Sequence, residues 1–430
     1  MAAKVSVPTR ILVLLCLMYF ITYIDRVNIS TAGTVIKSDF HLSNQQTGQI
    51  FSAFALPYLI IQFFGGAIAD KFGPRRTLAA CALIWAVATI STGFANGLYV
   101  LYACRLMVGV GEGASFATAS RAIQTWLPNG KRGFAQGMTH ASARLGNAAT
   151  PPLVAALITW ISWRGAFIVD GVFSLIWAVV WFFMFRDDPK THPGVTPEIL
   201  ATLPLPSVRA QRKEIPWTAL LLRILPVTLT YFCYGWTLWL LLSWLPGYFL
   251  NNFGMDLKGS GKFAAAVFFA GVIGDSFGGW VSDFLLRKTG SLKIARVGVI
   301  WVAFIGAALS LIGSQITTSL VPITLCLALG FFFLEVSIGA FWAMPGDIAP
   351  GYSGTASGLM NVGSAAAAMV SPPIFGFIVD KTGDWNVPFY GSIGLLVVGL
   401  VVSLFMRPDQ PFAPPGSGTG LSSPASVSAA

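Results

Sequence analysis

The stretch Gly65-Gly66-Ala-Ile-Ala-Asp70, followed by Arg75-Arg76, has a counterpart in the second half of the chain. There, Gly278-Gly279-Trp-Val-Ser-Asp283 is followed by Arg287-Lys288. Six-helix halves related by an internal repeat are typical of membrane transporters, in which the substrate site lies between the halves. The repeat therefore predicts two matching helical bundles with a substrate site between them.

The composition indicates an integral membrane protein. Of the 430 residues, 55% are hydrophobic and only 10% are charged, whereas soluble domains have about 25% charged residues. The five cysteines all fall in apolar runs without metal-ligand or disulfide spacing, so we expect packing roles for them. We find no metal-ligand cluster, no catalytic triad and no ordered phosphate-binding loop, and we therefore expect neither an enzyme nor a bound cofactor.

Twelve apolar segments exceed the ~20 residues that a membrane-spanning helix needs. They lie at roughly residues 10–36, 46–69, 75–96, 98–125, 131–160, 163–185, 219–251, 258–285, 293–314, 317–347, 352–380 and 385–406. We predict an all-α membrane protein with twelve transmembrane helices in two pseudo-symmetric six-helix bundles. The expected parts are an N-terminal bundle at 1–186, a cytoplasmic linker at 187–217, a C-terminal bundle at 218–407 and a disordered cytoplasmic tail at 408–430.

The distribution of basic residues predicts the orientation, because cytoplasmic loops are enriched in lysine and arginine. With a cytoplasmic N-terminus, the outside loops contain few basic residues: Lys37, Arg164, Lys258, Lys262 and Lys381. The inside loops contain many more: Lys71, Arg75, Arg76, Lys131, Arg132, Arg186, Lys190, Arg209, Arg212, Lys213, Arg287, Lys288, Lys293 and Arg296. We therefore expect both termini in the cytoplasm and assign the net charge of +10 to membrane orientation rather than to nucleic-acid binding.

Two motifs resemble a known family. Gly66-x-x-x-Asp70-Lys-x-Gly73-x-Arg75-Arg76 resembles the signature loop between spans two and three of the major facilitator superfamily. Tyr23-Ile-Asp25-Arg26-Val-Asn28, together with Arg105-x6-Glu112, resembles the anion:cation symporter branch, which includes bacterial galactonate and glucarate transporters, sialin and the vesicular glutamate transporters. The resemblance covers the chain from Arg10 to Arg407 and implies the major facilitator fold.

Two arginines are the first candidates for substrate binding. Arg26 and Arg105 are expected at similar depths in spans one and four, where two guanidinium groups would form a fork-shaped site for a carboxylate. The alternative is that they only pair with Asp25 or Glu112. Tyr58 matches a pocket tyrosine of the branch, although aromatic packing is an equally good explanation for it.

Acidic residues inside the membrane are candidates for proton coupling, because intramembrane ionisable groups usually mark a substrate or proton path. The resemblance assigns the coupled protons first to Glu112 and then to Asp25. An ion pair that only stabilises helix packing is the alternative for Asp25. Glu335 is an acid where related transporters are uncharged, and three roles stay open for it: a proton site, a partner of Arg144, or an inner gate.

The predicted pocket departs from the sugar-acid transporters. Arg144 replaces a non-charged pocket residue, which suggests a substrate with two carboxylates or a counter-charge for Glu112 or Glu335. Trp342 and Asn361 match pocket positions, although apolar packing is equally plausible for Trp342. The apolar residues that surround Trp342 leave room for a dicarboxylic or aromatic acid. His140 is interpreted as a packing or loop-facing residue.

A third group lies at the predicted cytoplasmic helix ends: Asp70, Arg75, Arg76 and Arg121. The resemblance implies that these residues latch the two halves while the carrier is open to the outside. No role is assigned to Asp170, Asp275 or Asp347.

The sequence therefore predicts a proton-coupled symporter that imports a small organic anion, such as a sugar acid, a dicarboxylate or an aromatic carboxylate, across the bacterial inner membrane. A uniporter or an anion exchanger on the same fold is the alternative. The expected partners are the anion, protons and the lipid bilayer, and we expect a monomer.

Overall fold

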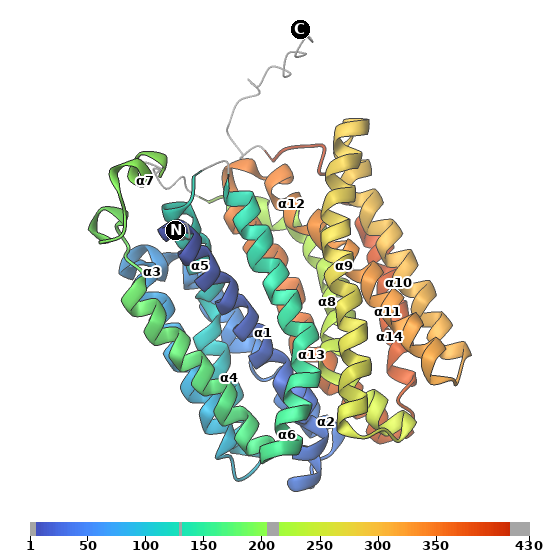
Figure 1. The fold of residues 1–430 in the computed structure, drawn as a ribbon. Helices are drawn as coiled ribbons and strands as arrows, with labels where there is room; N and C mark the ends of the chain where they lie inside the picture. Colours follow the sequence, from blue (N-terminus) through green and yellow to red (C-terminus); the bar gives the residue numbers. More distant parts are fainter. Residues whose placement is uncertain (1–5, 129–130, 204–214, 413–430) are drawn as a thin grey trace.

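The computed structural model describes residues 6–128, 131–203 and 215–412. In this part of the chain the protein is all-α, and its helices form two bundles that stand side by side (Figure 1). Both the start of α1 and the end of the described chain lie at the top of Figure 1, which we call the terminus end. The other side, at the bottom of Figure 1, is called the opposite end.

The N-terminal bundle crosses the membrane six times. Its helices are α1 (Val7–Asp39), α2 (Asn44–Ser52), α3 (Ala55–Gly93), α4 (Leu98–Gly113), α5 (Ser115–Trp126) and α6 (Arg132–Met184). Two of these helices turn back on themselves at a residue with a positive φ angle, Gly73 (φ 79°) in α3 and Ser162 (φ 85°) in α6. Each therefore contributes to two spans. The first part of α3 continues α2 in one span, and α4 and α5 together form another.

The C-terminal bundle also crosses six times. Its helices are α8 (Trp217–Phe253), α9 (Leu257–Thr289), a π-helical turn (Lys293–Gly298) leading into α10 (Val299–Ile316), α11 (Leu320–Val336), α12 (Ile338–Ile348), α13 (Ser353–Thr382) and α14 (Val387–Ser403). Along the chain, the two bundles are connected by a segment with a 3-10 turn (Pro189–Thr191) and α7 (Pro197–Thr202). A second 3-10 turn (Pro350–Tyr352) precedes α13. The predicted linker residues 204–214, with Arg209, Arg212 and Lys213, and the predicted tail residues 413–430 lie outside the described residues.

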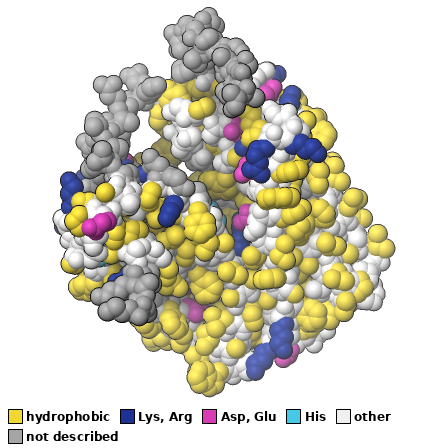
Figure 2. Space-filling model, turned by 45° about the horizontal axis from the view of Figure 1, so that its top comes forward, with side chains coloured by type: hydrophobic (Ala, Val, Ile, Leu, Met, Phe, Trp, Pro, Cys, Tyr) yellow, Lys and Arg dark blue, Asp and Glu magenta, His cyan; other side chains and the backbone are white. Residues whose placement is uncertain are grey.

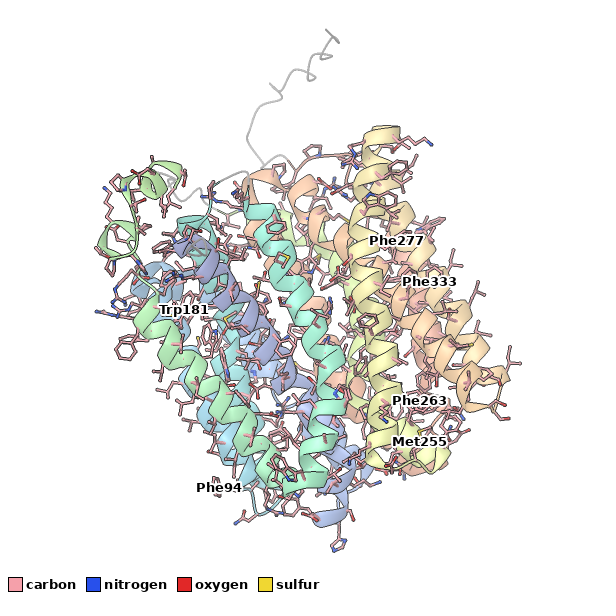
Figure 3. All side chains as sticks on the ribbon, viewed as in Figure 1. Phe94, Trp181, Met255, Phe263, Phe277 and Phe333 are labelled. Carbon is pink, nitrogen blue, oxygen red and sulfur yellow. The ribbon has the colours of Figure 1, made fainter. Side chains whose placement is uncertain are left out.

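The apolar side chains face both the core and the surroundings. In the N-terminal core Trp181 is fully buried and stacks on Trp177 and Phe185, with ring centroids 5.4 and 4.2 Å away. Large apolar side chains such as Phe94 and Phe277 instead project from the outside of the bundles (Figure 3). Eight helical stretches of the described chain are long and apolar enough to cross a membrane on length and composition alone. An apolar exterior around an apolar core is the arrangement of a protein in lipid.

The two bundles are in close contact at the opposite end, where α6 packs against α9 and α2 packs against α13. This contact depends on glycine, because a Cβ atom on Gly48 would collide with the backbone of Pro372, and one on Gly376 with the backbone of Asn44. Asp380 of α13 accepts hydrogen bonds from the backbone N–H groups of Asn44 and Gln45, at 3.0 and 2.8 Å. The carboxylate thus caps the N-terminus of α2, where the helix dipole favours a negative charge.

Candidate functional site

A cavity of about 630 Å³ lies between the two bundles. Its walls come from α1, α3, α5 and α6 on one side and from α8, α12 and α13 on the other. Lining residues such as Gln136 and Ser357 belong to the first turns of α6 and α13, so the cavity extends toward the terminus end. Figure 2 looks at that end and shows a hollow between the halves with charged side chains on its walls.

Arg26 lies on the cavity wall within an aromatic surround. Its Nε atom donates to Oε2 of Glu112 at 2.6 Å. The guanidinium carbon is 4.9 Å from the ring centroid of Tyr23, 4.8 Å from that of Tyr58 and 5.1 Å from that of Phe116. Rings at this distance attract a cation without neutralising it. The Nη2 atom has no hydrogen-bond partner among the described residues, so Arg26 retains a donor for an anion.

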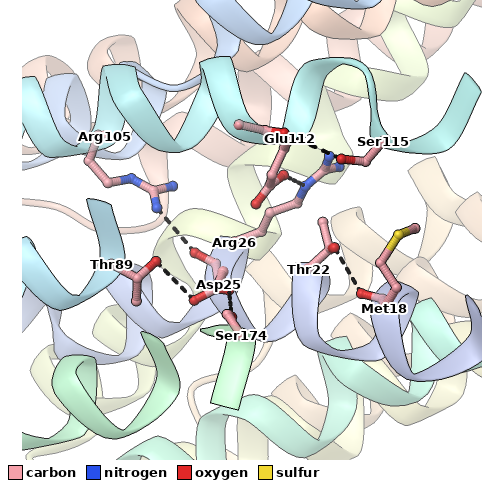
Figure 4. Close-up of polar contacts among 10 residues, drawn as sticks. Met18, Thr22, Asp25, Arg26, Thr89, Arg105, Glu112, Ser115 and Ser174 are labelled. Carbon is pink, nitrogen blue, oxygen red and sulfur yellow. Dashed lines mark hydrogen bonds and ion pairs between the residues drawn. The ribbon is translucent and has the colours of Figure 1, made fainter. Parts of the chain in front are cut away.

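Arg105 lies behind this wall rather than on it. It is 2% exposed, and its Nη1 atom donates to the backbone oxygen of Asp25 at 3.1 Å (Figure 4). It does not belong to the lining of the cavity. The ring of Phe54 lies 5.2 Å from the guanidinium of Arg105 and 5.8 Å from that of Arg26. In this conformation only Arg26 of the two lines the cavity, and the ring of Phe54 lies against both guanidinium groups. A carboxylate site shared by Arg26 and Arg105 stays a prediction.

Asp25 lies in a buried polar cluster beside Arg105. Its carboxylate accepts hydrogen bonds from Thr89 at 3.2 Å and from Ser174 at 3.0 Å (Figure 4). The Asn28 amide contacts Asp25 at 3.4 Å and Asp170 at 3.3 Å, which gives Asp170 a place that the sequence did not reveal. Two acids connected through one amide, with Asp25 only 1% exposed, form a site that can accommodate a proton.

Arg144 joins the two halves. It lines the cavity from α6, and its Nε atom donates to Oδ2 of Asp275 at 3.2 Å. Its Nη2 atom forms an ion pair with Oε2 of Glu335 at 2.9 Å, and Tyr234 donates to the other oxygen of Glu335 at 3.2 Å. Of the open alternatives, the structure thus pairs Arg144 with Glu335 rather than with Glu112.

The remaining predicted pocket residues line the cavity. The ring of Tyr58 contacts Arg26, Trp342 is 42% exposed, and Asn361 donates to Gln62 of the opposite half at 2.9 Å. His140 also lines the cavity and lies between Tyr19 and Trp342, with ring centroids 5.6 and 6.3 Å away. His140 was interpreted as a packing or loop-facing residue; it lies one turn before Arg144 on the same face of the helix, and its ring packs on the cavity wall.

In this conformation the contacts of the predicted latch residues with the rest of the described chain stay within the N-terminal half. Asp70 pairs with Arg121 at 3.1 Å inside the N-terminal bundle, and both side chains are about half exposed. Arg75 donates to the backbone oxygen of Phe182 at 2.8 Å in the same bundle, and Arg76 follows it in α3. A latch formed with the outside open stays a prediction. In the C-terminal bundle Asp347 accepts from Arg296 at 2.8 Å.

The model for the Major Facilitator Superfamily matches residues 15–372. The chain belongs to this superfamily. A probable sulfoacetate transporter of Cupriavidus necator is 44% identical over 411 residues, which cover 95% of this chain and 96% of the relative. A hexuronate transporter of Bacillus subtilis is 30% identical over 415 residues, again 95% and 96% of the two chains.

The fold has a close match among solved structures. A bacterial homologue of the human lysosomal transporter Spinster, in an inward-facing and unoccupied conformation, matches with a TM-score of 0.79 at 16% identity, over 96% of this chain and 100% of that chain. The predicted superfamily and its twelve-helix fold are therefore confirmed. This member of the superfamily is a multi-pass membrane transporter, not an enzyme.

Proposed function

We propose that this transporter imports a small organic anion together with protons across the bacterial inner membrane. The observation that carries the proposal is Arg26, a cation on the wall of a cavity between the halves, with one guanidinium nitrogen that has no hydrogen-bond partner in the described part of the chain. Intramembrane arginines of this kind mark substrate paths, and a guanidinium binds carboxylate or sulfonate oxygens with charge-assisted hydrogen bonds. One chain contains the whole cavity, so we propose a monomer as the transport unit.

The proposed substrate is a short anion with two acidic groups. Arg26 would bind the first group and Arg144 the second, since both line the same cavity. Sulfoacetate, the compound in the name of the relative that is 44% identical, carries a sulfonate and a carboxylate on two carbons. We rank it above sugar acids, because Arg26 and Arg144 give the cavity one cation for each of two acidic groups.

Glu112 is proposed to couple proton and anion binding. Its carboxylate and the substrate compete for the guanidinium of Arg26, to which Glu112 is bound at 2.6 Å. A proton on Glu112 removes the competing charge and releases Arg26 for the anion, so each ligand favours the binding of the other. Asp25 and Glu335 are proposed as the further proton sites, in the buried cluster and beside Arg144 respectively.

The direction of transport follows from the proposed orientation. If the basic loops place the terminus end in the cytoplasm, the cavity extends toward the cytoplasm and the contact between α2 and α13 closes the outside. Moving one charge through 100 mV is worth about 2.3 kcal/mol. The membrane potential, negative inside, therefore assists uptake only if the protons outnumber the negative charges of the anion.

Uptake into proteoliposomes tests the proposal. Purified protein should accumulate radiolabelled sulfoacetate when the outside is acidified, and the lumen should acidify in proportion. Malonate, galactonate and benzoate in excess should rank the competing substrate classes. Exchange of sulfoacetate without any response to the pH gradient would favour the alternative of a uniporter or exchanger. No transport of any anion in the panel would contradict the proposal.

A further inference from the structure

A second, smaller cavity lies between the halves at the opposite end of the molecule. It measures about 120 Å³, and its walls come from α1, α2 and α8 together with Trp385. Its lining combines aromatic and aliphatic residues with six uncharged polar residues: Ser30, Thr34, Asn44, Thr47, Ser243 and Asn251. Such a lining differs from the apolar packing found elsewhere in the core, and it gives the cavity hydrogen-bonding capacity that packing alone does not require.

This outer cavity lies in line with the central one. A gap of only about 10 Å³ shares Ser30 and Phe51 with the outer cavity and shares Arg26 and Phe54 with the central cavity. A volume of this size admits no more than about one water molecule. The outer cavity is therefore a separate chamber on the route between the opposite end and Arg26.

Lys37 gives the outer cavity its charge. Among the described residues it is the one cation in the lining, and none of those lining residues is an aspartate or glutamate. Lys37 makes no ion pair within residues 6–128, 131–203 and 215–412; its Nζ atom instead donates to Oδ1 of the neutral Asn44 at 2.7 Å. The Thr34 hydroxyl, also in the lining, is buried without a partner in the same residues. A cation without a counter-charge next to an unused hydroxyl is a site for a small anion.

The same lysine is connected to the contact that closes the opposite end. The Nδ2 atom of Asn44 donates to Oδ1 of Asp380 at 2.7 Å, so the chain from Lys37 through Asn44 to Asp380 crosses from one half to the other. An anion that attracts Lys37 would remove one of the two side-chain contacts that orient Asn44. Binding in the outer cavity is thereby linked to the stability of the contact between α2 and α13.

We propose that the outer cavity is a capture site, in which Lys37 binds the organic anion before it reaches Arg26 and loosens the closure of the opposite end. This inference rests on the proposed function for the identity of the anion. It assigns to Lys37 a role in affinity on one side of the membrane only, because the central cavity does not contain this residue.

Sided transport measurements test the proposal with sulfoacetate as the probe. Lys37→Met should raise the KM for uptake from the opposite end about tenfold, while the KM for efflux from the terminus end changes less than twofold. Lys37→Arg should retain most of the wild-type affinity. Lys262→Met removes the same charge from an exposed position at the same end and should change neither KM. Equal changes on both sides, or no change on either side, would overturn the capture site.

A binding measurement separates this inference from the proposed function. In the Arg26→Ala protein the central site is weakened, and sulfoacetate at concentrations too low to fill it should still quench the fluorescence of Trp244 and Trp385, which line the outer cavity. Adding Lys37→Met should abolish that quenching, and its persistence would contradict the proposal. If the wild-type protein did not transport sulfoacetate but the Arg26→Ala protein still bound it through Lys37, the proposed function would be wrong and the capture site would stand.

Discussion

Glu112 and Glu335 occupy corresponding places in the two bundles. Each lies two residues before the break in its membrane-spanning segment, at Ala114 between α4 and α5 and at Ser337 between α11 and α12. Each is fully buried and contacts an arginine of the N-terminal half, Glu112 at 2.6 Å and Glu335 at 2.9 Å. The two ion pairs differ in the halves that they connect. Glu112 and Arg26 both belong to the N-terminal half, whereas Glu335 of the C-terminal half pairs with Arg144 of the N-terminal half.

Glu112→Gln should abolish the proton-driven accumulation of substrate and preserve exchange. The glutamine keeps the shape of the side chain but cannot release a proton, so Arg26 stays available at every pH. We expect accumulation to fall at least tenfold in proteoliposomes, and counterflow to become independent of pH between 5 and 8. Normal accumulation by Glu112→Gln would show that the coupled proton binds elsewhere.

Arg26→Ala and Arg105→Ala should differ in their effect on affinity. Arg26 lines the cavity, and the loss of a charge-assisted hydrogen bond costs roughly 1.5–3 kcal/mol, or about ten- to a hundredfold in Kd. Arg105 lies behind Phe54, so its removal should change the Kd measured from the terminus end by less than about fivefold and act mainly on transport rate. Isothermal titration of both purified variants checks this difference, and a larger loss of affinity in Arg105→Ala would contradict the geometry.

Arg144→Gln should weaken the binding of anions with two acidic groups more than the binding of anions with one. We expect the Kd for sulfoacetate or malonate to rise at least tenfold while the Kd for acetate changes little. The substitution also leaves Glu335 and Asp275 without their cation, and an unpaired buried charge is destabilising. The double variant Arg144→Gln/Glu335→Gln therefore serves as the control, since it should regain thermal stability without regaining selectivity. Equal losses for both classes of anion would indicate a purely structural role.

Gly376→Leu should favour the conformation that is open at the opposite end. Any side chain here meets the backbone of Asn44 and must separate α13 from α2. The measurement is the labelling of a cysteine introduced at Ser243, in the outer cavity, by a membrane-impermeant thiol reagent added at that end. We expect labelling to accelerate severalfold. Gly391→Leu is the matched control, because a Cβ atom at Gly391 has open space around it, and equal acceleration in both variants would refute the prediction.

The sequence predicted how deep in the membrane the candidate site residues lie better than it predicted which way their side chains point. The length of each apolar segment fixes where Arg26, Glu112 and Glu335 lie along their helices, and the internal repeat predicted two bundles. Whether Arg105 reaches the cavity depends on the rotation of α4 and on the Phe54 ring, which only the packed structure determines. The ion pair between Arg144 and Asp275 joins residues that are 131 positions apart in the chain, and no local sequence pattern predicts it.

A carrier must also make the return journey empty. In the proposed cycle the departing anion would leave Arg144 with an uncompensated positive charge in the middle of the membrane. Glu335 and Asp275 of the other bundle form ion pairs with Arg144 and so neutralise this charge when no anion is bound. Two carboxylates of the protein thus occupy the position proposed for an acidic group of the substrate, and a substrate that binds Arg144 must displace them.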